Sequence, residues 1–281
     1  IMFMAFSLDR KQDKVKSLSK GFLPYMALLM ILIALLLKQP DLGSAVTLFL
    51  VAFIMLFSAG TRARHILSVI LLAVPFFYLL VVNVEYRLRR FKGFWDPWKD
   101  PLGSGYQIIQ SMLAFGKGGL SGMGLGSGLQ KLFYLPEAHT DFILAVIGEE
   151  FGLLGVTVVI GMFFLLVQRA FCIAMAAPDI FGRFLALGIA GLFGIEVIIN
   201  MGVVTGMLPT KGLALPFLSY GGSSLVVSLF AVGILLNISS GLHLPGNLQF
   251  PARKQAPIKK NAAGGGVFCV FIAMKPSGFR H

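Results

Sequence analysis

Acidic side chains and a histidine gather in the stretch YLPEAHTDF, residues 134–142, immediately before a long apolar run. The stretch contains Glu137, His139 and Asp141, and two glutamates follow within the run. Acids in or beside a membrane segment are costly to keep and usually serve a function. Asp141 could also simply cap the helix that begins there, with Thr140 as the competing cap. The company of four further ionisable groups favours a functional site.

A second polar group lies in the stretch GMLPTKGLALPFLSYGGSS, residues 206–224, where two prolines break any helix. Lys211 is isolated among apolar neighbours, and a lone lysine at a helix end commonly extends toward the membrane interface. The hydroxyls of Thr210, Tyr220, Ser223 and Ser224 are near it in the chain. A cation with several hydroxyls could instead hold a pyrophosphate or a sugar.

Segment 85–141 is too long for a simple connection, and it opens with aromatic and basic side chains in EYRLRRFKGFWDPWKD. One interpretation is an anchor in the membrane lipids, because tryptophan suits the interface. The other is a groove for an anionic lipid headgroup, in which arginines grip phosphate. The residues concerned are Arg87, Arg89, Arg90, Trp95 and Trp98.

Nine glycines follow between residues 103 and 128. Glycine permits positive φ and close approach of the backbone to a ligand. The GxG patterns do not follow a strand, which excludes a dinucleotide or phosphate-loop interpretation. A mobile loop and a re-entrant loop lining a cavity are the two alternatives.

The composition places these groups in a membrane protein, because 57% of the 281 residues are hydrophobic and only 13% are charged. The net charge of +12 does not indicate nucleic-acid binding. The basic residues sit in short segments between apolar runs, as expected beside an anionic leaflet. Cys172 and Cys269 are far apart and form neither a disulfide framework nor a metal-binding spacing.

Uncharged runs near the 20 residues that a helix needs to cross a bilayer predict the spans. Backbone groups in lipid must be paired internally, and the runs lack the alternation of barrel strands. The predicted fold is an all-α polytopic transmembrane bundle of about six spans plus the end of a seventh, residues 1–6, with a long outer loop. Residues 1–240 form the predicted membrane domain, and 241–281 a basic, flexible cytoplasmic tail. The six spans are 21–37, 42–60, 66–84, 151–168, 184–204 and 217–238.

The two sides of this bundle differ in positive charge. One side carries 15 of the 24 Lys and Arg residues, in segments 9–20, 61–65, 169–183 and the tail from 239. The other side has Lys38, Lys211 and seven in the long segment 85–141, and long segments count less toward orientation. The first side is therefore predicted to face the cytoplasm, although the arginines just after residue 85 argue weakly against this.

Four stretches together resemble the SEDS family (shape, elongation, division and sporulation). They are QPDLGSA at 39–45, DPWKDPLGSGYQIIQS at 96–111, YLPEAHTDFILAVIGEEFGLLG from 134, and GMLPTKGLALPFLSYGGSS. The similarity runs in order from about residue 10 to 240. The forms PEAHTDF and MLPTKGLALPF are most similar to the family member that acts in division, with the elongation and sporulation members as alternatives.

The resemblance implies a ten-helix fold with both ends in the cytoplasm. It also implies an enzyme of the bacterial cytoplasmic membrane, at the division septum, that polymerises lipid II into glycan strands on the outer face. Its partners would be a class B penicillin-binding protein and other divisome proteins. Counted back from the long outer loop, the six spans match the family's last six. The first three and a half helices would then be missing.

The resemblance also assigns roles to residues. Asp141 matches the family's catalytic aspartate and would be the general base, with Glu137 and His139 orienting it or contacting sugar. Lys211 resembles an essential family lysine and would stabilise the pyrophosphate leaving group, for which the arginines at 87, 89 and 90 are weaker candidates. A divalent cation is a further option, without a visible set of ligands. A lipid II flippase and a non-catalytic scaffold are the rival functions.

Overall fold

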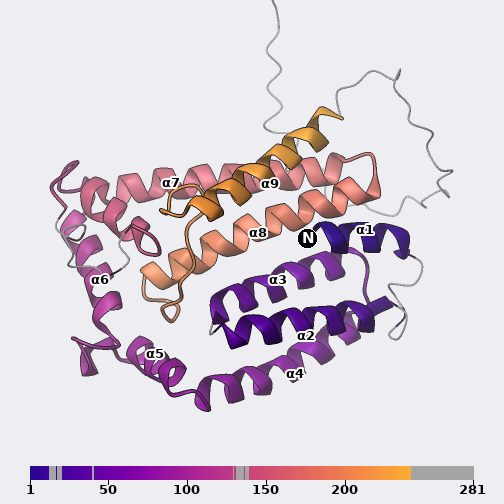
Figure 1. Ribbon diagram of the computed structural model, residues 1–281. Helices are drawn as coiled ribbons and strands as arrows, with labels where there is room; N and C mark the ends of the chain where they lie inside the picture. The colour runs from indigo at the N-terminus through magenta and orange to yellow at the C-terminus, as the bar shows by residue number, and fades with distance from the viewer. Residues whose placement is uncertain are drawn as a thin grey trace, which may run out of the picture.

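The computed structural model describes residues 1–12, 17, 21–39, 41–128, 130, 136 and 139–241, and within them it contains helices and no strand. Figure 1 shows most of the helices running side by side, with their connections gathered at two ends. The elements are α1 (Met2–Arg10), α2 (Leu23–Lys38), α3 (Leu42–Ser58), α4 (Ala63–Val82), α5 (Glu85–Trp95), the short 3-10 helix η3 (Pro97–Lys99), α6 (Tyr106–Gly118), α7 (Ile143–Ala176), α8 (Ile180–Val204) and α9 (Gly222–Ser240).

Each of the six predicted spans coincides with a helix, which confirms the all-α fold class. In the described part, α7, α8 and α9, with 34, 25 and 19 residues, are long and apolar enough to cross a membrane. Helices α2 and α3 are shorter apolar helices of 16 and 17 residues. At 1.5 Å per residue they extend only about 24 to 26 Å, against a hydrocarbon core of about 30 Å.

Two predicted boundaries are displaced for identifiable reasons. Helix α7 begins at Ile143 and not at 151, because Glu149 and Glu150 lie inside the helix although they interrupt the uncharged run. Helix α9 begins at Gly222 and not at 217, because the preceding loop continues past Pro216.

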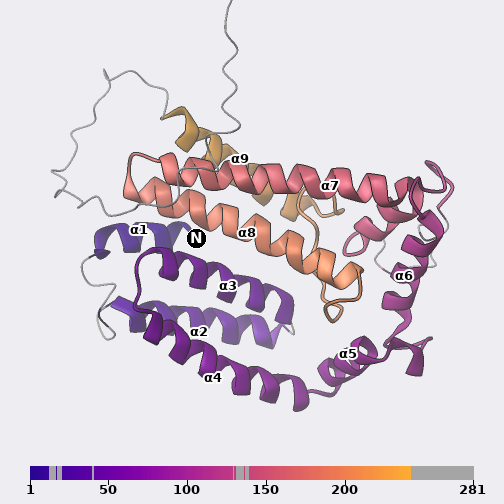
Figure 2. The same ribbon diagram turned by 180° about the vertical axis from the view of Figure 1, so that it is seen from behind.

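Helix α8 is the centre of the bundle. It packs against α7, α3, α1 and α9, as Figures 1 and 2 show from opposite sides. Its buried side chains include Phe193, at 1% exposure, and Val204, at 0%. By contrast α7 and α9 expose large apolar side chains such as Phe164 and Phe230. Apolar outer faces around a packed central helix are what a bundle surrounded by lipid requires.

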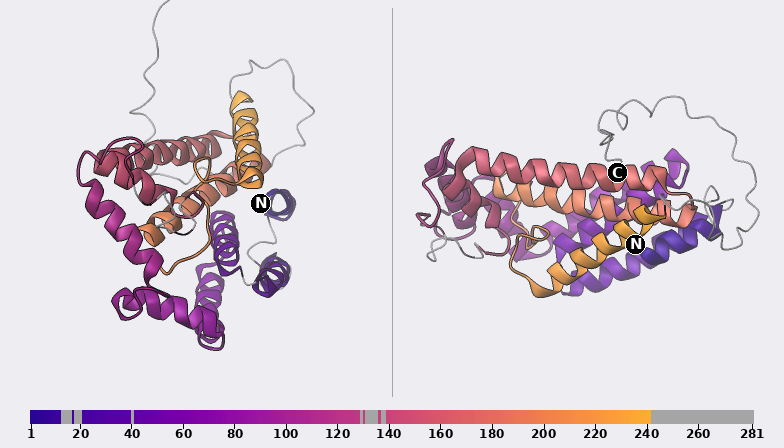
Figure 3. Two further views of the ribbon diagram at one scale, coloured as in Figure 1. Left: turned by 60° about the vertical axis from the view of Figure 1, so that its left-hand side comes forward. Right: turned by 90° about the horizontal axis from the view of Figure 1, so that it is seen from above.

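The connections fall at two ends of the bundle, in the same grouping that the sequence predicted (Figure 3). One end carries the α3–α4 and α7–α8 connections, and the other carries the α2–α3 turn, α5, α6 and the α8–α9 loop. The end that faces the cytoplasm stays a prediction. The tail from residue 242 lies outside the described residues, so the predicted boundary after residue 240 also stays a prediction.

The glycine-rich segment packs against a break in α7. Gly152 has φ 66° and ψ −162°, which is not helical, so α7 is two helices joined at a bend. The Leu153 N–H donates to the Gly119 carbonyl (2.9 Å), and the Met123 N–H donates to the Glu149 carbonyl (3.0 Å). A Cβ on Gly152 would lie 2.4 Å from the nitrogen of Gly122, so only glycine permits this approach.

Candidate active site

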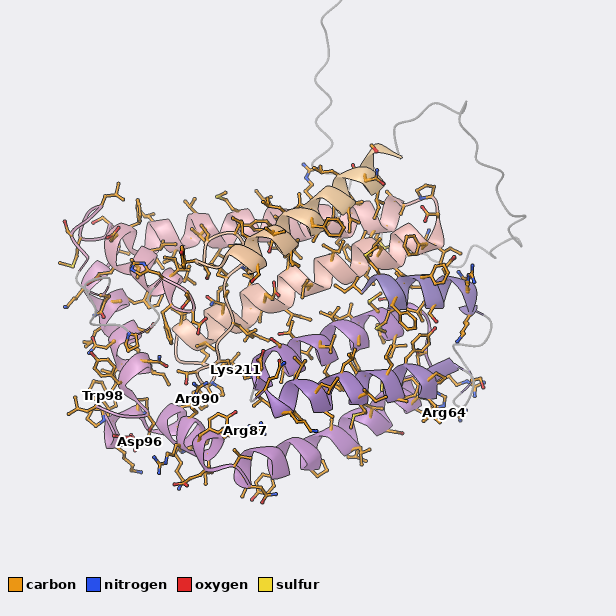
Figure 4. All side chains as sticks on the ribbon, viewed as in Figure 1. Arg64, Arg87, Arg90, Asp96, Trp98 and Lys211 are labelled. Atoms are coloured by element: carbon orange, nitrogen blue, oxygen red, sulfur yellow. The ribbon has the colours of Figure 1, made fainter. Side chains whose placement is uncertain are left out.

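A cavity of about 590 Å³ opens at the end of the bundle that carries α5 and α6. Four of the predicted site residues line it: Asp141, Lys211, Arg87 and Arg90. They come from three segments far apart in the chain, namely α5, the turn before α7, and the α8–α9 loop. Figure 4 shows Arg87 and Arg90 on α5 near Lys211, with Arg64 at the opposite end of the bundle.

Helical periodicity decides which arginines of α5 reach the cavity. Arg87, Arg90 and Phe94 lie three or four residues apart on one helix face, and all three line the cavity. Arg89 is on another face, where it forms an exposed ion pair with Glu85 (2.6 Å) and lines no part of the cavity. Of the three predicted arginines, only two are therefore in position to meet a ligand here.

Arg87 also holds the wall of the cavity in place. Its side chain is buried, at 8% exposure. Nε donates to the Tyr86 hydroxyl (3.1 Å), and Nη2 lies 3.5 Å from the Leu37 carbonyl at the end of α2. The guanidinium also lies 5.6 Å from the centre of the Tyr86 ring. Burial strengthens the field of a cation, because less water screens it.

Asp141 lies one residue before the N-cap position of α7. The residue before the helix is Phe142, without a capping side-chain hydrogen bond, whereas Asp41 caps α3 through the Ser44 N–H (2.9 Å). The backbone around Asp141 is instead fixed by tertiary contacts: Phe142 is 1% exposed, and the Asp141 carbonyl accepts a hydrogen bond from Asn200 Nδ2 (2.8 Å). Asp141 lies in the lining of the cavity, in a turn that these contacts hold in place.

The α8–α9 loop brings Lys211 to the same wall. A Cβ on the next residue, Gly212, would lie 3.4 Å from Asp141 Oδ2, so the loop passes directly against the carboxylate. Lys211 is partly buried, and this burial lowers the pKa of its amino group below the usual lysine value. The neighbouring Thr210 is 6% exposed and also lines the cavity.

The other predicted residues lie elsewhere. His139 is exposed, does not line the cavity, and accepts a hydrogen bond at its carbonyl from the Tyr220 N–H (2.8 Å). Ser223 and Ser224 are in the first turn of α9, outside the cavity lining. Glu137 lies outside the described residues. The structure thus joins four predicted residues in one cavity and does not join these three described ones to them.

Glu149, which the sequence marked as an unusual acid, has a structural partner. It is fully buried, and its Oε2 accepts a hydrogen bond from the Gln130 N–H (3.0 Å). The Gln130 side chain in turn donates to Gln110 Oε1 on α6 (3.1 Å). A buried carboxylate that binds a loop backbone explains the acid without catalysis, and Glu149 does not line the cavity.

Sequence reasoning missed two residues beside the site. Asp41 of the motif QPDLGSA lines the same cavity while capping α3. Asn200 is an amide at 2% exposure in α8, and a polar side chain in a largely apolar span was the signal that could have found it.

The lining of the cavity combines three cations, Lys211, Arg87 and Arg90, with two carboxylates, Asp41 and Asp141. This set suits a ligand that carries both negative charge and hydroxyl groups. Among the described residues no three His, Cys, Asp or Glu side chains come together as metal ligands.

Residues 1–243 match the family profile FTSW_RODA_SPOVE, described as "Cell cycle protein". The probable peptidoglycan glycosyltransferase FtsW of Trichlorobacter lovleyi is 68% identical over 244 residues, which are 87% of this chain and 64% of that protein. Stage V sporulation protein E of Bacillus subtilis is 46% identical over 239 residues, 85% of this chain and 65% of the relative. The chain thus spans slightly less than two thirds of the length of these relatives.

Two solved structures are similar in fold. A chain of a peptidoglycan synthase complex, described as coordinating polymerization and crosslinking, superposes with a TM-score of 0.67 at 33% identity, over 86% of this chain and 67% of that one. The rod shape determining protein RodA of Thermus thermophilus gives a TM-score of 0.54 at 29% identity, over 87% and 64%.

With its apolar helices and this family match, the protein is a membrane protein, and the resemblance seen in its motifs is confirmed. The chain belongs to the FtsW/RodA/SpoVE family of cell cycle proteins, the SEDS family.

Proposed function

We propose that this chain carries the active site of a peptidoglycan glycosyltransferase that polymerises lipid II into glycan strands during cell division. The observation that carries the proposal is the cavity that gathers Asp141 with Lys211, Arg87 and Arg90. The similarity to proteins named probable peptidoglycan glycosyltransferase FtsW supports the reaction and the role in division. The mixed charge of the cavity fits a sugar linked to a pyrophosphate.

Asp141 is the proposed general base. In lipid II the sugar is α-linked to a pyrophosphate, and the glycan product is β-1,4-linked, so the configuration at the anomeric carbon inverts. A single displacement achieves this when the acceptor 4-hydroxyl loses its proton while it attacks. A carboxylate within about 3 Å of that hydroxyl can accept the proton. The backbone bonds around Asp141 would hold it in place for this step.

Lys211, Arg87 and Arg90 are proposed to stabilise the pyrophosphate as its bond to the sugar breaks. A pyrophosphate is already a good leaving group, so a general acid is less important than positive charge near its oxygens. Two guanidinium groups can each bind phosphate oxygens through paired N–H donors. The three cations line the same cavity as Asp141, as an in-line displacement requires of base and leaving-group contacts.

We further propose that the cavity opens on the outer face of the bacterial cytoplasmic membrane, at the septum. The uneven distribution of Lys and Arg supports this orientation. A class B penicillin-binding protein and other divisome proteins are the proposed partners. The fold similarity to a chain of a peptidoglycan synthase complex supports a crosslinking partner.

The test is polymerisation of lipid II by the purified full-length protein, with and without the penicillin-binding protein. Asp141→Asn keeps the shape of the side chain and removes the base, so the rate should fall by about 10²- to 10⁴-fold. Asp96→Asn is the matched control, because Asp96 lies on the same end of the bundle outside the cavity and should keep the wild-type rate.

Three results would contradict the proposal. Normal polymerisation by Asp141→Asn would exclude a general base at this position. Transfer of labelled lipid II across vesicles without polymer would indicate a flippase. A protein that only stimulates its partner's crosslinking, with or without Asp141, would be a scaffold.

A further inference from the structure

We propose that Asn200 is a positioning residue that fixes the segment of Asp141 and the segment of Lys211 relative to one another. This inference rests on the proposed function, because it assigns to Asn200 an effect on the proposed base. The observation behind it is one buried amide that donates to the backbone of both segments.

The side-chain amide of Asn200 donates two hydrogen bonds to backbone carbonyls. Asn200 lies in the last part of α8 at 2% exposure, and its Nδ2 donates to the Asp141 carbonyl and to the Leu213 carbonyl, each at 2.8 Å. An NH2 group has two hydrogens, and each finds one carbonyl. Because both acceptors are carbonyl oxygens, the network itself assigns the nitrogen to this position. Among the described residues Oδ1 has no partner, so the side chain contributes through its NH2 alone.

The second carbonyl leads directly to the lysine. The Leu213 N–H donates to the Lys211 carbonyl (3.0 Å), so the turn that Asn200 holds is the one that carries the lysine. The same two segments meet again on the other side of Asp141. There the Ser219 hydroxyl donates to the Thr140 carbonyl. These bonds of Asn200 and Ser219 form a seam between the segment of Asp141 and the segment of Lys211, and Asn200 lies at its buried end.

The contacts of this seam would set the distance between the proposed base and the proposed leaving-group cation. The proposed base and the proposed leaving-group cation act on opposite sides of one sugar, so their separation must match the substrate. A displacement of about 1 Å at a reacting group can cost about 10²-fold in rate. Without the amide, two buried carbonyls lose their donors and the segments can separate, while the residues that contact substrate remain unchanged.

The decisive experiment is a double-mutant cycle in the full-length protein with lipid II as substrate. Asn200→Asp replaces the NH2 by an oxygen that faces two carbonyls, and it should lower kcat about 10²-fold with a smaller change in KM. In an Asp141→Asn background the same substitution should change the residual rate by less than about 3-fold, because Asn200 acts through Asp141. A merely structural role would instead lower both backgrounds equally, and that result would overturn the inference.

Matched variants keep the experiment decisive. Asn237→Asp changes an asparagine of α9 at the other end of the bundle and should leave kcat unchanged. Should Asn200→Asp fail to fold, the cycle is run with two other variants. Asn200→Ser retains one donor, and Ser219→Ala removes the neighbouring bonds that the Ser219 hydroxyl donates to the Thr140 carbonyl and accepts from the Leu215 N–H. Each of these variants should lower kcat when residue 141 is the native aspartate, and should leave kcat unchanged when Asp141→Asn is also present.

Hydrogen exchange supplies a readout that does not depend on activity. The amides of Leu213, Leu215 and Tyr220 are bonded within this seam, at 3.0, 2.7 and 2.8 Å. Asn200→Asp should accelerate their exchange together, and unchanged exchange would overturn the inference. A wild-type protein that makes no polymer would refute the proposed function, and the exchange result would still decide whether Asn200 joins the two segments.

Discussion

The charge of Lys211 depends on its burial. Removing an ammonium group from water disfavours its charged form, which is why the pKa of Lys211 lies below the usual lysine value. In its proposed role of holding a pyrophosphate, Lys211 must be cationic. It loses this charge at a lower pH than an exposed lysine does. The burial of the side chain in the α8–α9 loop is what lowers this pH.

The rate of polymerisation should therefore fall on the alkaline side at a pH below about 10.4, the usual lysine pKa. Lys211→Arg should move this fall to higher pH, because guanidinium stays protonated, and Lys211→Gln should lower the rate and weaken use of the donor at every pH. The measurement is kcat against pH for the three proteins. An unchanged alkaline limb in Lys211→Arg would contradict a role for the Lys211 charge.

The same shift has a defined sign for stability. Between the lowered native pKa and the higher unfolded pKa, the unfolded chain binds more protons, so stability rises with pH across that interval. Below the native pKa the lysine is charged in both states, and its full desolvation penalty is present. Lys211→Gln should remove this pH dependence, which thermal unfolding at several pH values would detect.

The bend in α7 shows how an element is shaped by a neighbour. Helix α7 would continue through residue 152 if intrahelical hydrogen bonding decided its course. Instead the carbonyls of Glu149 and Glu150 accept hydrogen bonds from the glycine-rich segment, whose Met123 and Gly124 N–H groups donate at 3.0 Å. The backbone groups released by the bend are thus satisfied, as membrane depth requires.

Gly152→Ala should destabilise this junction. The φ of 66° with ψ of −162° is a region that only glycine enters without strain, costing about 1–3 kcal/mol for other residues, and the new Cβ would also meet Gly122. Gly161→Ala is the matched control in the same helix, with no atom within 4 Å of its Cβ, and should be neutral or slightly stabilising. Thermal unfolding of both variants, with proteolysis of segment 118–124, is the measurement, and equal behaviour would contradict the account.

The bundle as a whole is organised around α8, which provides both core packing and support for the candidate site. Phe193 lies in the core at 1% exposure, with its ring 5.5 Å from that of Phe217 in the α8–α9 loop. Phe217 has a φ of 64°, which is unusual for a residue other than glycine. The core of the bundle therefore holds a strained residue in the same loop as Lys211.

Phe193→Ala should lower the free energy of unfolding by about 3–5 kcal/mol, because it leaves a cavity in a packed core. It should also reduce polymerisation, since it removes the support under Phe217. Phe164→Ala, at 65% exposure on the outer face of α7, is the control and should change stability little. Melting temperature and rate in detergent or lipid vesicles measure both effects, and similar losses in the two variants would contradict the central role of α8.

Local patterns in the chain were sufficient for the fold class and for drawing attention to four residues of the candidate cavity. Hydropathy places the helices because lipid excludes unpaired backbone, and each predicted span lies on a helix. The acidic cluster before an apolar run, the isolated lysine and the basic opening of segment 85–141 drew attention to Asp141, Lys211, Arg87 and Arg90. The family resemblance supplied their expected roles, and all four line one cavity. Helical spacing could even have separated Arg89 from its neighbours.

Contacts between distant segments determined the support of Asp141, the bend in α7 and the set of residues that line the cavity. Asn200 meets Asp141 across 59 residues, and no periodicity of either segment encodes that meeting. The bend at Gly152 depends on the glycine-rich segment that precedes α7 in the chain and packs against it. Helix propensity alone would have predicted a continuous α7. His139, Ser223 and Ser224 are near the site in the chain and outside its cavity in space. Sequence spacing reports neighbours along one helix or strand, whereas the tertiary placement of α5, the turn before α7 and the α8–α9 loop determines which side chains share the cavity.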